Sequence, residues 1–349
     1  MTRAEATRQL AYAVVSTGAA LAAAETIVRW SDGGTLPQID CYEHVLASAE
    51  RRETILFRPN CARDLSDAHG GRWTLRVADD RLRALPLPPP EHPWLIVGDS
   101  QVLGMGVDAA EIAVTRLGRA GVSVRGVGVP GHGVEDALGF AETLLTPDSR
   151  GVILVVNGAN DWVEAGRPVA QRFAVRGGWL VDPARADGLA GRFFASRLPW
   201  SHFLTYLVVL TAHDWRVDPA EKRWRDSPWG LEGKEREHAA HIIAGAIQTF
   251  AAAHPTLPVR VTLLPVDFST SEARAKAVLS ADHLRTMPWT DASPWQELRE
   301  ALGEVPYLDL GPTLADSADF LRDDYHLSVE GHEKMAHAIL RWLSTEPAQ

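Results

Sequence analysis

The sequence is poor in cysteine and has no concentration of basic residues, and both shortages exclude classes of protein. Its 349 residues include only Cys41 and Cys61, too few for a disulfide framework or a four-cysteine zinc site. This pair either forms one disulfide in an oxidising compartment or remains two buried thiols. The 35 Lys and Arg residues against 45 Asp and Glu give a formal net charge of -10. Without a basic stripe to neutralise phosphates, we expect no nucleic-acid partner.

Signals for a cofactor or a metal are also missing. No group of residues has the spacing of metal ligands, and His332 and His337, five positions apart on one expected helix, point to different faces. The glycine-rich stretch 126–133 matches neither the phosphate-loop pattern nor a dinucleotide fingerprint. We therefore expect neither a metal nor a cofactor.

Residues 10–24 form an uncharged, alanine-rich run that follows basic residues near the amino terminus. This pattern is typical of a secretory signal or a short membrane anchor, and Ala22 and Ala24 offer a cleavage site. The run is shorter than the ~20 apolar residues of a membrane-spanning helix, so a tether would extend over residues 10–28. The alternative is an ordinary helix of a cytoplasmic protein. We favour an extracytoplasmic or membrane-tethered location.

The hydrophobic content of 46% is enough for a full core, and its pattern predicts an α/β fold. Five short apolar runs predict buried parallel strands, and the segments between them are long enough for crossover helices. The expected architecture is a three-layer, flavodoxin-like, doubly wound five-stranded parallel sheet. The expected strands are 94–97, 122–129, 151–156, 259–266 and 305–310, and the expected helices are 134–145, 234–253, 295–302 and 329–343.

Three segments make up the expected chain organisation. Residues 1–30 are an anchor-like helix, residues 31–90 a lead-in segment without strong periodicity, and residues 91–349 the main domain. An aromatic-rich insert at about 165–230 interrupts the alternation of strands and helices in that domain. It is either a helical cap over the site or an extension of the core without ligand contact. Its aromatic residues are Phe193, Phe194, Trp200, Phe203, Tyr206, Trp215, Trp224 and Trp229.

Polar residues that can carry chemistry follow four of the expected strands, where the functional groups of an open α/β sheet gather. The first strand is followed by Gly98-Asp99-Ser100, and the second by the glycine-rich stretch, whose exposed N–H groups can bind an anion. The third is followed by Asn157-Gly158-Ala159-Asn160-Asp161, and the fifth by Asp323-Asp324-Tyr325-His326. A carboxylate on the same loop as an imidazole can fix its tautomer and make it a competent base.

These four blocks, in this order, resemble the SGNH hydrolases, also called the GDSL esterase and lipase superfamily. The likeness covers residues from about 94 to 345, with 165–257 aligned to no block, and the last helix carries Gly331 and Ala336 as in that family. The resemblance implies that Ser100 is the nucleophile, His326 the general base and Asp323 its orienting partner. It also implies an oxyanion hole made by the backbone N–H groups of Ser100 and Gly131 and the side chain of Asn160.

The sequence departs from the family pattern at two positions. Gln101 stands where the namesake motif has Leu, a position that we expect to tolerate change, and Gly126 stands where members often carry Asn. Asp324 competes with Asp323 for the orienting role, but the three-residue spacing favours Asp323. His132 is either a residue at the rim of the site or a plain loop residue.

The leading functional hypothesis is a serine esterase that acts on a small acyl ester through an acyl-Ser100 intermediate. The alternative close in chemistry is an O-acetyltransferase or deacetylase of a cell-envelope carbohydrate, suggested by the anchor and by aromatic residues that could stack on sugars. A non-catalytic module that binds an acylated glycan is a third hypothesis. The expected partner is thus a small-molecule or carbohydrate ester.

Overall fold

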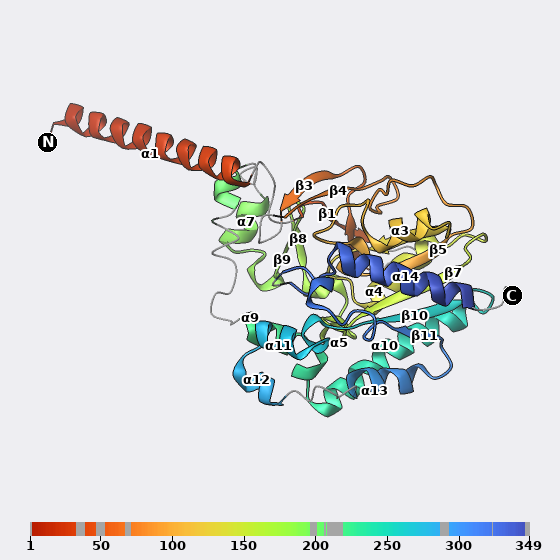
Figure 1. The fold of residues 1–349 in the computed structure, drawn as a ribbon. Helices are drawn as coiled ribbons and strands as arrows, with labels where there is room; N and C mark the ends of the chain where they lie inside the picture. The colour runs from red at the N-terminus through yellow and green to blue at the C-terminus, as the bar shows by residue number, and fades with distance from the viewer. Residues whose placement is uncertain are drawn as a thin grey trace.

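The structure is a computed structural model, and it describes residues 2–32, 39–46, 53–66, 71–195, 201–205, 207, 219–286, 293–322 and 324–345. At its centre is one sheet of five parallel strands in the order β11-β10-β7-β5-β6 (Figure 1). The strands are β5 (Trp94–Gly98), β6 (Val124–Gly128), β7 (Gly151–Asn157), β10 (Val259–Leu264) and β11 (Tyr307–Asp309). All five were expected, and every residue of β5 and β7 is buried, as in a sheet covered on both faces.

Helices cover both faces of this sheet, so the expected three-layer α/β fold is confirmed. Alternate residues of β5 explain the two layers, because Leu95 and Val97 belong to one buried cluster and Trp94 and Ile96 to the other. The first cluster includes residues of α4 (Val134–Leu144), α10 (Gly233–Ala253) and α13 (Ser293–Leu302). The second includes residues of α3 (Ala113–Arg119) and α14 (Val329–Thr345).

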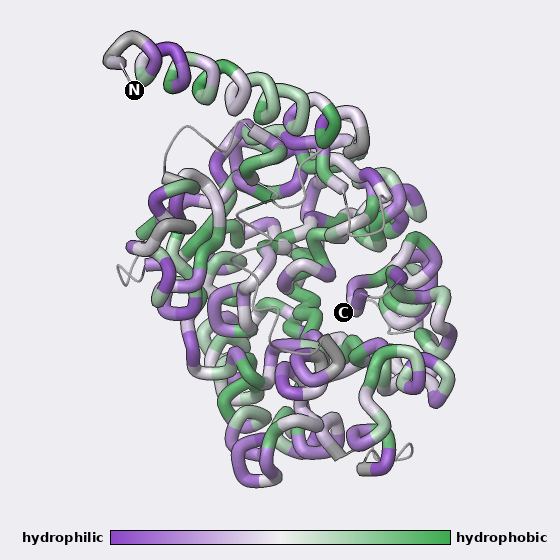
Figure 2. Tube along the Cα trace, turned by 90° about the vertical axis from the view of Figure 1, so that its left-hand side faces the viewer, coloured by the Kyte–Doolittle hydropathy of each residue, from purple (hydrophilic) through white to green (hydrophobic). Residues whose placement is uncertain are grey.

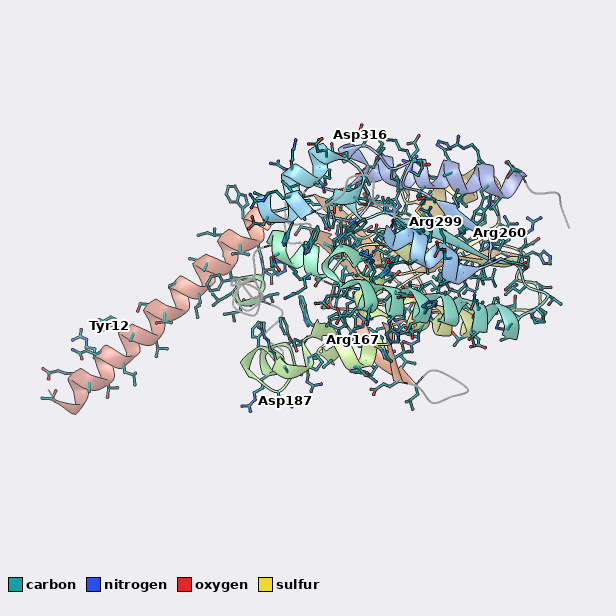
Figure 3. The ribbon with its side chains drawn as sticks, turned by 90° about the horizontal axis from the view of Figure 1, so that it is seen from below. Tyr12, Arg167, Asp187, Arg260, Arg299 and Asp316 are labelled. Carbon is teal, nitrogen blue, oxygen red and sulfur yellow. A yellow bond between two sulfur atoms is a disulfide. The ribbon has the colours of Figure 1, made fainter. Side chains whose placement is uncertain are left out.

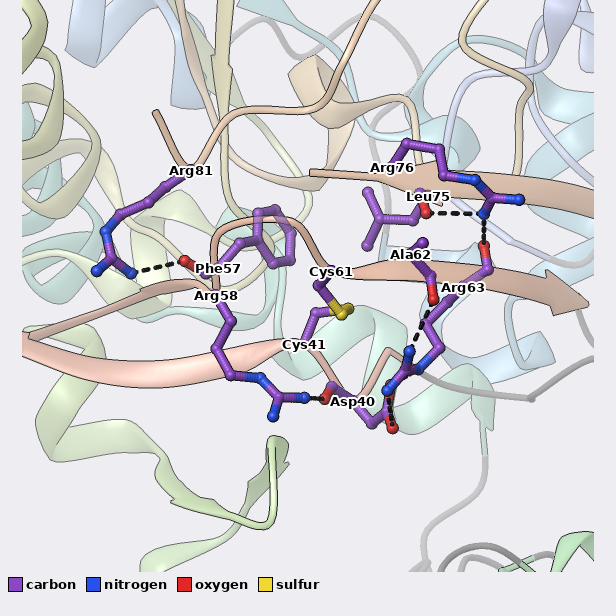
Figure 4. Close-up of a disulfide and its surroundings, with 10 residues drawn as sticks. All are labelled: Asp40, Cys41, Phe57, Arg58, Cys61, Ala62, Arg63, Leu75, Arg76 and Arg81. Carbon is purple, nitrogen blue, oxygen red and sulfur yellow. Dashed lines mark hydrogen bonds and ion pairs between the residues drawn. A yellow bond between two sulfur atoms is a disulfide. The ribbon is translucent and has the colours of Figure 1, made fainter. Parts of the chain in front are cut away.

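The segment between residues 31 and 90, expected as a lead-in segment without strong periodicity, contains two antiparallel hairpins. They pair β1 (Tyr42–Leu46) with β2 (Glu53–Phe57) and β3 (Ala62–Ser66) with β4 (Arg72–Arg76). A disulfide joins Cys41 to Cys61, with 5.9 Å between their Cα atoms, so the two cysteines are not free thiols (Figure 4). Arg58 and Arg63 both donate to Asp40 next to this disulfide, at 2.6 and 3.0 Å. The hairpins pack on the main core rather than forming a linker.

Helix α1 (Arg3–Asp32) projects from the rest of the molecule, and Tyr12 on it points to solvent (Figures 1 and 3). Residues Glu5–Trp30 are long and apolar enough to cross a membrane, and none of the most apolar stretch is buried. Apolar colours run along the middle of this helix in Figure 2. At its inner end, the Glu25 carboxylate accepts hydrogen bonds from the Ser201 hydroxyl at 2.7 Å and from the Phe203 N–H at 2.9 Å.

The insert is built of short elements and includes a hairpin that was not expected. Its described elements are α5 (Asp161–Glu164), α6 (Val169–Arg172), β8 (Ala174–Arg176), β9 (Trp179–Val181), α7 (Leu189–Ala195) and α9 (Pro219–Arg225). Phe194 stacks on Trp179 with 5.0 Å between ring centroids, so this aromatic residue builds the core of the insert. The predicted aromatic positions Trp200, Tyr206 and Trp215 lie outside the described residues.

The remaining helices are short and stand near the carboxyl ends of the strands or between the last two. They are α2 (Ser100–Leu103), α11 (Glu272–Val278) and α12 (Ala281–Thr286), with 3-10 turns at Pro183–Arg185, Pro228–Gly230, Asp267–Ser269 and Ser317–Asp319.

Candidate active site

Ser100 stands directly after β5, as the first residue of the short helix α2. Asp99 caps this helix, because its Oδ1 accepts the N–H of Gln101 at 2.9 Å. The turn requires glycine at position 98, since a Cβ there would lie 2.7 Å from the Val102 side chain and 3.2 Å from the Val155 carbonyl oxygen. The sheet and the cap therefore hold the Ser100 hydroxyl at the carboxyl edge of the sheet.

His326 reaches Ser100 from a position 226 residues later in the chain. Its Nε2 lies 2.8 Å from the Ser100 Oγ, and its Nδ1 lies 2.8 Å from Oδ1 of Asp324. With Nδ1–H donating to the carboxylate, Nε2 is free to accept the serine proton. The imidazole is buried, whereas the Asp324 side chain is 37% exposed. Serine, histidine and aspartate thus form one hydrogen-bonded chain.

Asp324 supplies the carboxylate in this chain, whereas the expected Asp323 lies outside the described residues. The local backbone gives the reason. Oδ1 of Asp324 also accepts the backbone N–H of His326 at 3.3 Å, which turns the side chain back toward the imidazole two residues on. A spacing of two residues therefore suffices for the orienting contact.

Arg274 of α11 anchors the loop that carries Asp324, and it was not identified from the sequence. Its guanidinium donates to the carbonyl oxygens of Asp324 and Leu321, at 2.7 and 3.0 Å, and to the Asp267 carboxylate at 2.9 Å. Arg274 and Asp267 are both buried. The Leu321 N–H also donates to the His326 carbonyl oxygen at 2.7 Å. Hydrogen bonds from a buried arginine and from the backbone thus hold the loop of the base.

The three groups expected to form an oxyanion hole line one pocket together with His326. Ser100, Gly131 and Asn160 all contribute to its wall, and its volume is about 810 Å³. Gly131 has a φ of +79°, a conformation that favours glycine, and a Cβ there would lie 3.1 Å from the Phe173 ring. Asn160 directly precedes α5 after the end of β7. The structure therefore places Ser100, Gly131, Asn160 and His326 around one pocket.

A buried hydrogen-bond network behind Ser100 shows the roles of Asn157 and Asp161, two further residues of the sequence blocks. The Asn157 amide donates to Oδ2 of Asp99 at 2.8 Å, and the Asn157 N–H donates to Oδ2 of Asp161 at 2.6 Å. Burial and the nearby Asp99 carboxylate raise the pKa of Asp161 well above its usual value. Asn157 therefore links the ends of β5 and β7, a role that the Asn-Gly-x-Asn-Asp pattern did not reveal.

Arg172 of the insert holds the loop of Gly131. Its guanidinium donates to the Gly131 carbonyl oxygen at 2.5 Å and to Oε1 of Glu164 at 2.6 Å, with Asp136 at 3.5 Å. Burial raises the pKa of Glu164 to about 7, and the charge of Arg172 opposes that rise. The insert is therefore bonded to the loop expected to bind the oxyanion, a link that no sequence pattern indicated.

Two further parts of the chain contribute to the pocket wall. Ile39 and Tyr42 belong to the hairpin region, and Phe173 and Leu180 belong to the insert. The charged residues that line the wall, besides Glu164 and Arg172, are Arg167, Asp182, Lys222 and Asp226 (Arg167 is labelled in Figure 3). His132 does not lie at the rim, because it is buried and its Nε2 lies 2.7 Å from the Ile55 carbonyl oxygen.

Among the described residues, one group has the geometry of potential metal ligands: Asp40 with Cys41 and Cys61. Both cysteines are consumed by the disulfide, so this group offers no thiolate.

No family model matches the chain, and no curated protein matches it in sequence. Solved structures with a similar arrangement include a protein assigned to the G-D-S-L lipolytic family from Desulfitobacterium hafniense, with 12% identity and a TM-score of 0.36 over 72% of this chain and 98% of that one. Another is the psychrotrophic esterase EstA from Pseudoalteromonas sp., with 12% identity and a TM-score of 0.36 over 73% of this chain and 100% of that one.

Proposed function

We propose that this protein is a serine esterase that hydrolyses small acyl esters through an acyl-Ser100 intermediate. The observation that carries this proposal is the hydrogen-bonded chain from Ser100 through His326 to Asp324, with 2.8 Å at each link, at the wall of an 810 Å³ pocket. A serine that serves only to cap or pack has no need of an oriented imidazole within hydrogen-bond distance.

The geometry supports the following reaction. The Ser100 Oγ attacks the ester carbonyl carbon while His326 Nε2 takes the hydroxyl proton, and the carbonyl electrons move to the oxygen. The C–O bond to the alcohol then breaks, the alcohol oxygen takes the proton from Nε2, and the acyl group stays on Ser100. Water repeats these steps in place of the serine and releases the carboxylic acid. Asp324 orients the ring and stabilises the imidazolium in both halves.

Three donors would stabilise the oxyanion: the N–H groups of Ser100 and Gly131 and the Asn160 side chain. This assignment is supported by the position of all three residues at the pocket wall, which His326 also lines. Removal of one such donor typically costs about 3 kcal/mol in the barrier. Arg172 would preserve this arrangement through its bond to the Gly131 carbonyl oxygen.

The test is hydrolysis of p-nitrophenyl esters of increasing acyl length by the full chain. We expect the acetyl ester to be turned over best and Ser100→Ala to lower kcat by a factor of about 10⁴ or more. Ser149→Ala, in a surface turn, is the matched control and should retain wild-type turnover. Equal turnover by the wild type and Ser100→Ala would overturn the proposal.

A second candidate is transfer of the acyl group to, or its removal from, a carbohydrate hydroxyl. It is favoured by the charged side chains of Arg167, Asp182, Lys222 and Asp226 at the pocket wall, which can bond a hydroxyl-rich alcohol. The two functions separate in an acceptor assay, in which an activated acetyl ester is consumed with and without an oligosaccharide. Acetylated sugar and faster release of the leaving alcohol would indicate transfer, and an unchanged rate with acetate alone would indicate hydrolysis.

We also propose that α1 tethers the catalytic domain to a membrane, outside the cytoplasm. The unburied apolar span Glu5–Trp30 supports the tether, and the Cys41–Cys61 disulfide supports an oxidising compartment. We expect the full chain to sediment with membranes and to need detergent for release. Recovery of the full-length chain in the soluble cytoplasmic fraction would contradict the tether.

A further inference from the structure

Gln101, the residue after Ser100, was expected to tolerate change, yet its side chain makes specific contacts in the structure. It is 1% exposed and directed at the loop of His326. Its amide nitrogen donates to the carbonyl oxygen of Tyr325 at 3.0 Å, and its Oε1 accepts the N–H of Leu327 at 3.1 Å. The two bonded residues are the immediate neighbours of His326 on either side.

This arrangement ties the base to the nucleophile through one side chain. The backbone of Gln101 is fixed beside Ser100, because its N–H donates to the Asp99 carboxylate at 2.9 Å in the first turn of α2. Both polar ends of its amide are used on the backbone that flanks His326. The Gln101 side chain is thus a second connection between the segments of Ser100 and His326, in addition to the 2.8 Å contact between His326 Nε2 and Ser100 Oγ.

We propose that Gln101 is a positioning residue, which sets the distance and direction of His326 relative to Ser100. The inference rests on the proposed function, since it concerns the same reaction. An apolar side chain at this position fills space but cannot bond Tyr325 and Leu327, so the loop of His326 would lose its direct connection to the residue after Ser100. Gln101 itself touches neither the ester nor the reacting atoms.

Gln101 differs in this respect from a residue that only stabilises the fold. Loss of a structural hydrogen bond lowers the free energy of unfolding but leaves the reaction of the folded enzyme unchanged. Loss of a positioning contact lowers the rate of the chemical step, because a displacement of about 1 Å can cost a factor of about 100. Binding of the substrate, which Gln101 does not contact, should stay the same.

The experiment compares Gln101→Met, Gln101→Glu and Gln248→Met with the wild type. Gln248 is the matched control, because its amide also donates to a backbone carbonyl, that of Ala301 at 2.9 Å, far from the site in α10. The measured quantities are the second-order rate of Ser100 modification by a fluorophosphonate, kcat and KM for p-nitrophenyl acetate, the thermal unfolding midpoint and the hydrogen exchange of the Leu327 N–H.

For Gln101→Met we expect kcat and the rate of modification to fall by a factor of about 10 to 100, with KM nearly unchanged. Gln248→Met should keep the wild-type rates. In Gln101→Glu, the introduced carboxyl can donate to Tyr325 only while protonated, so its rate relative to the wild type should rise as the pH falls. Rates of Gln101→Met equal to those of the wild type would overturn the inference.

The proposed function and this inference can fail separately. If the wild type is not modified at Ser100, the esterase proposal fails. The hydrogen exchange of the Leu327 N–H then still tests whether Gln101 holds the loop of His326. Faster exchange of this N–H in Gln101→Met than in the wild type is the expected result. Exchange equal in both proteins would show that Gln101 does not hold the loop of His326.

Discussion

The carboxyl edge of the parallel sheet and the disulfide-linked hairpin region, residues 39–76, differ in how they are stabilised. At the edge, Ser100, Asn157 and His326 are themselves buried and are held by hydrogen bonds of side chains to other side chains and to the backbone. In the hairpin region, strands of five residues are held by a disulfide and by arginine bonds to Asp40. Buried polar contacts stabilise the first region, and a covalent link together with apolar packing on the main core stabilises the second.

The two regions also contribute differently to the candidate site. The edge supplies the candidate reacting groups, whereas the hairpin region supplies part of the wall around them through Ile39 and Tyr42. The two regions meet at His132, whose Nε2 lies 2.7 Å from the Ile55 carbonyl oxygen of β2. Damage to the edge should therefore abolish the chemistry, and damage to the hairpins should weaken the fold and the binding of substrate.

The largest effect in this comparison is expected from Asp324→Asn. The amide cannot hold the Nδ1–H of His326 as the carboxylate does, so kcat for p-nitrophenyl acetate should fall by a factor of about 1,000 or more, with the unfolding midpoint little changed. Asp323→Asn is the matched control one position earlier and should keep most of the activity. A large loss in Asp323→Asn with none in Asp324→Asn would reverse the assignment of the orienting carboxylate.

Removal of the disulfide tests the hairpin region. The double substitution Cys41→Ser with Cys61→Ser releases a loop of 20 positions and should lower the free energy of unfolding by about 3 kcal/mol, measured by urea denaturation. Since Tyr42 lies next to Cys41 and lines the pocket, KM should rise while kcat changes little. The wild type under reducing conditions should show the same loss. No loss in either case would mean that the disulfide does not stabilise this region.

A smaller effect is expected behind the edge, at His332 of α14. Burial, aided by the charge of Arg83, lowers the pKa of His332 to about 3, and its Nδ1 accepts the Ala113 N–H at 3.3 Å. The unfolded chain therefore binds this proton first as the pH falls. The stabilising contribution is complete above about pH 6.5 and is lost progressively toward pH 3, by about 2 kcal/mol at pH 5.

Urea denaturation at pH 7 and pH 5 measures this contribution. His332→Asn should lose less stability between these two values than the wild type. His337→Asn, exposed on the same helix, is the control and should follow the wild type. If the wild type and His332→Asn lost equal stability between pH 7 and pH 5, the buried neutral imidazole would not be the cause.

Sequence patterns predicted the strands and helices whose residues form a continuous apolar run or a clear apolar period. All five central strands, helix α4 and helix α14 were expected because each presents a clear period or a fully buried run. The hairpins were missed because strands such as β3 and β4 contain only one and two buried residues among exposed or partly exposed ones, so neither presents a continuous apolar run. Their pairing also depends on contacts that no local pattern records.

The candidate site shows the same limit at the level of single residues. Ser100, Gly131, Asn160 and His326 were selected by their blocks, and the structure places them around one pocket. Gln101, Arg172 and Arg274 were not, because each acts through backbone carbonyl oxygens that are remote in sequence. A block identifies the groups that react, and the residues that hold those groups become visible only when the chain is folded.

The central claim is that His326 activates Ser100 as a nucleophile. The most direct measurement is treatment of the full chain with a fluorophosphonate, followed by mass spectrometric location of the adduct in the wild type, Ser100→Ala and His326→Ala. The account predicts one adduct on Ser100 in the wild type and none in either variant at the same time and concentration. An adduct on another residue, or equal modification of Ser100 in His326→Ala, would contradict it.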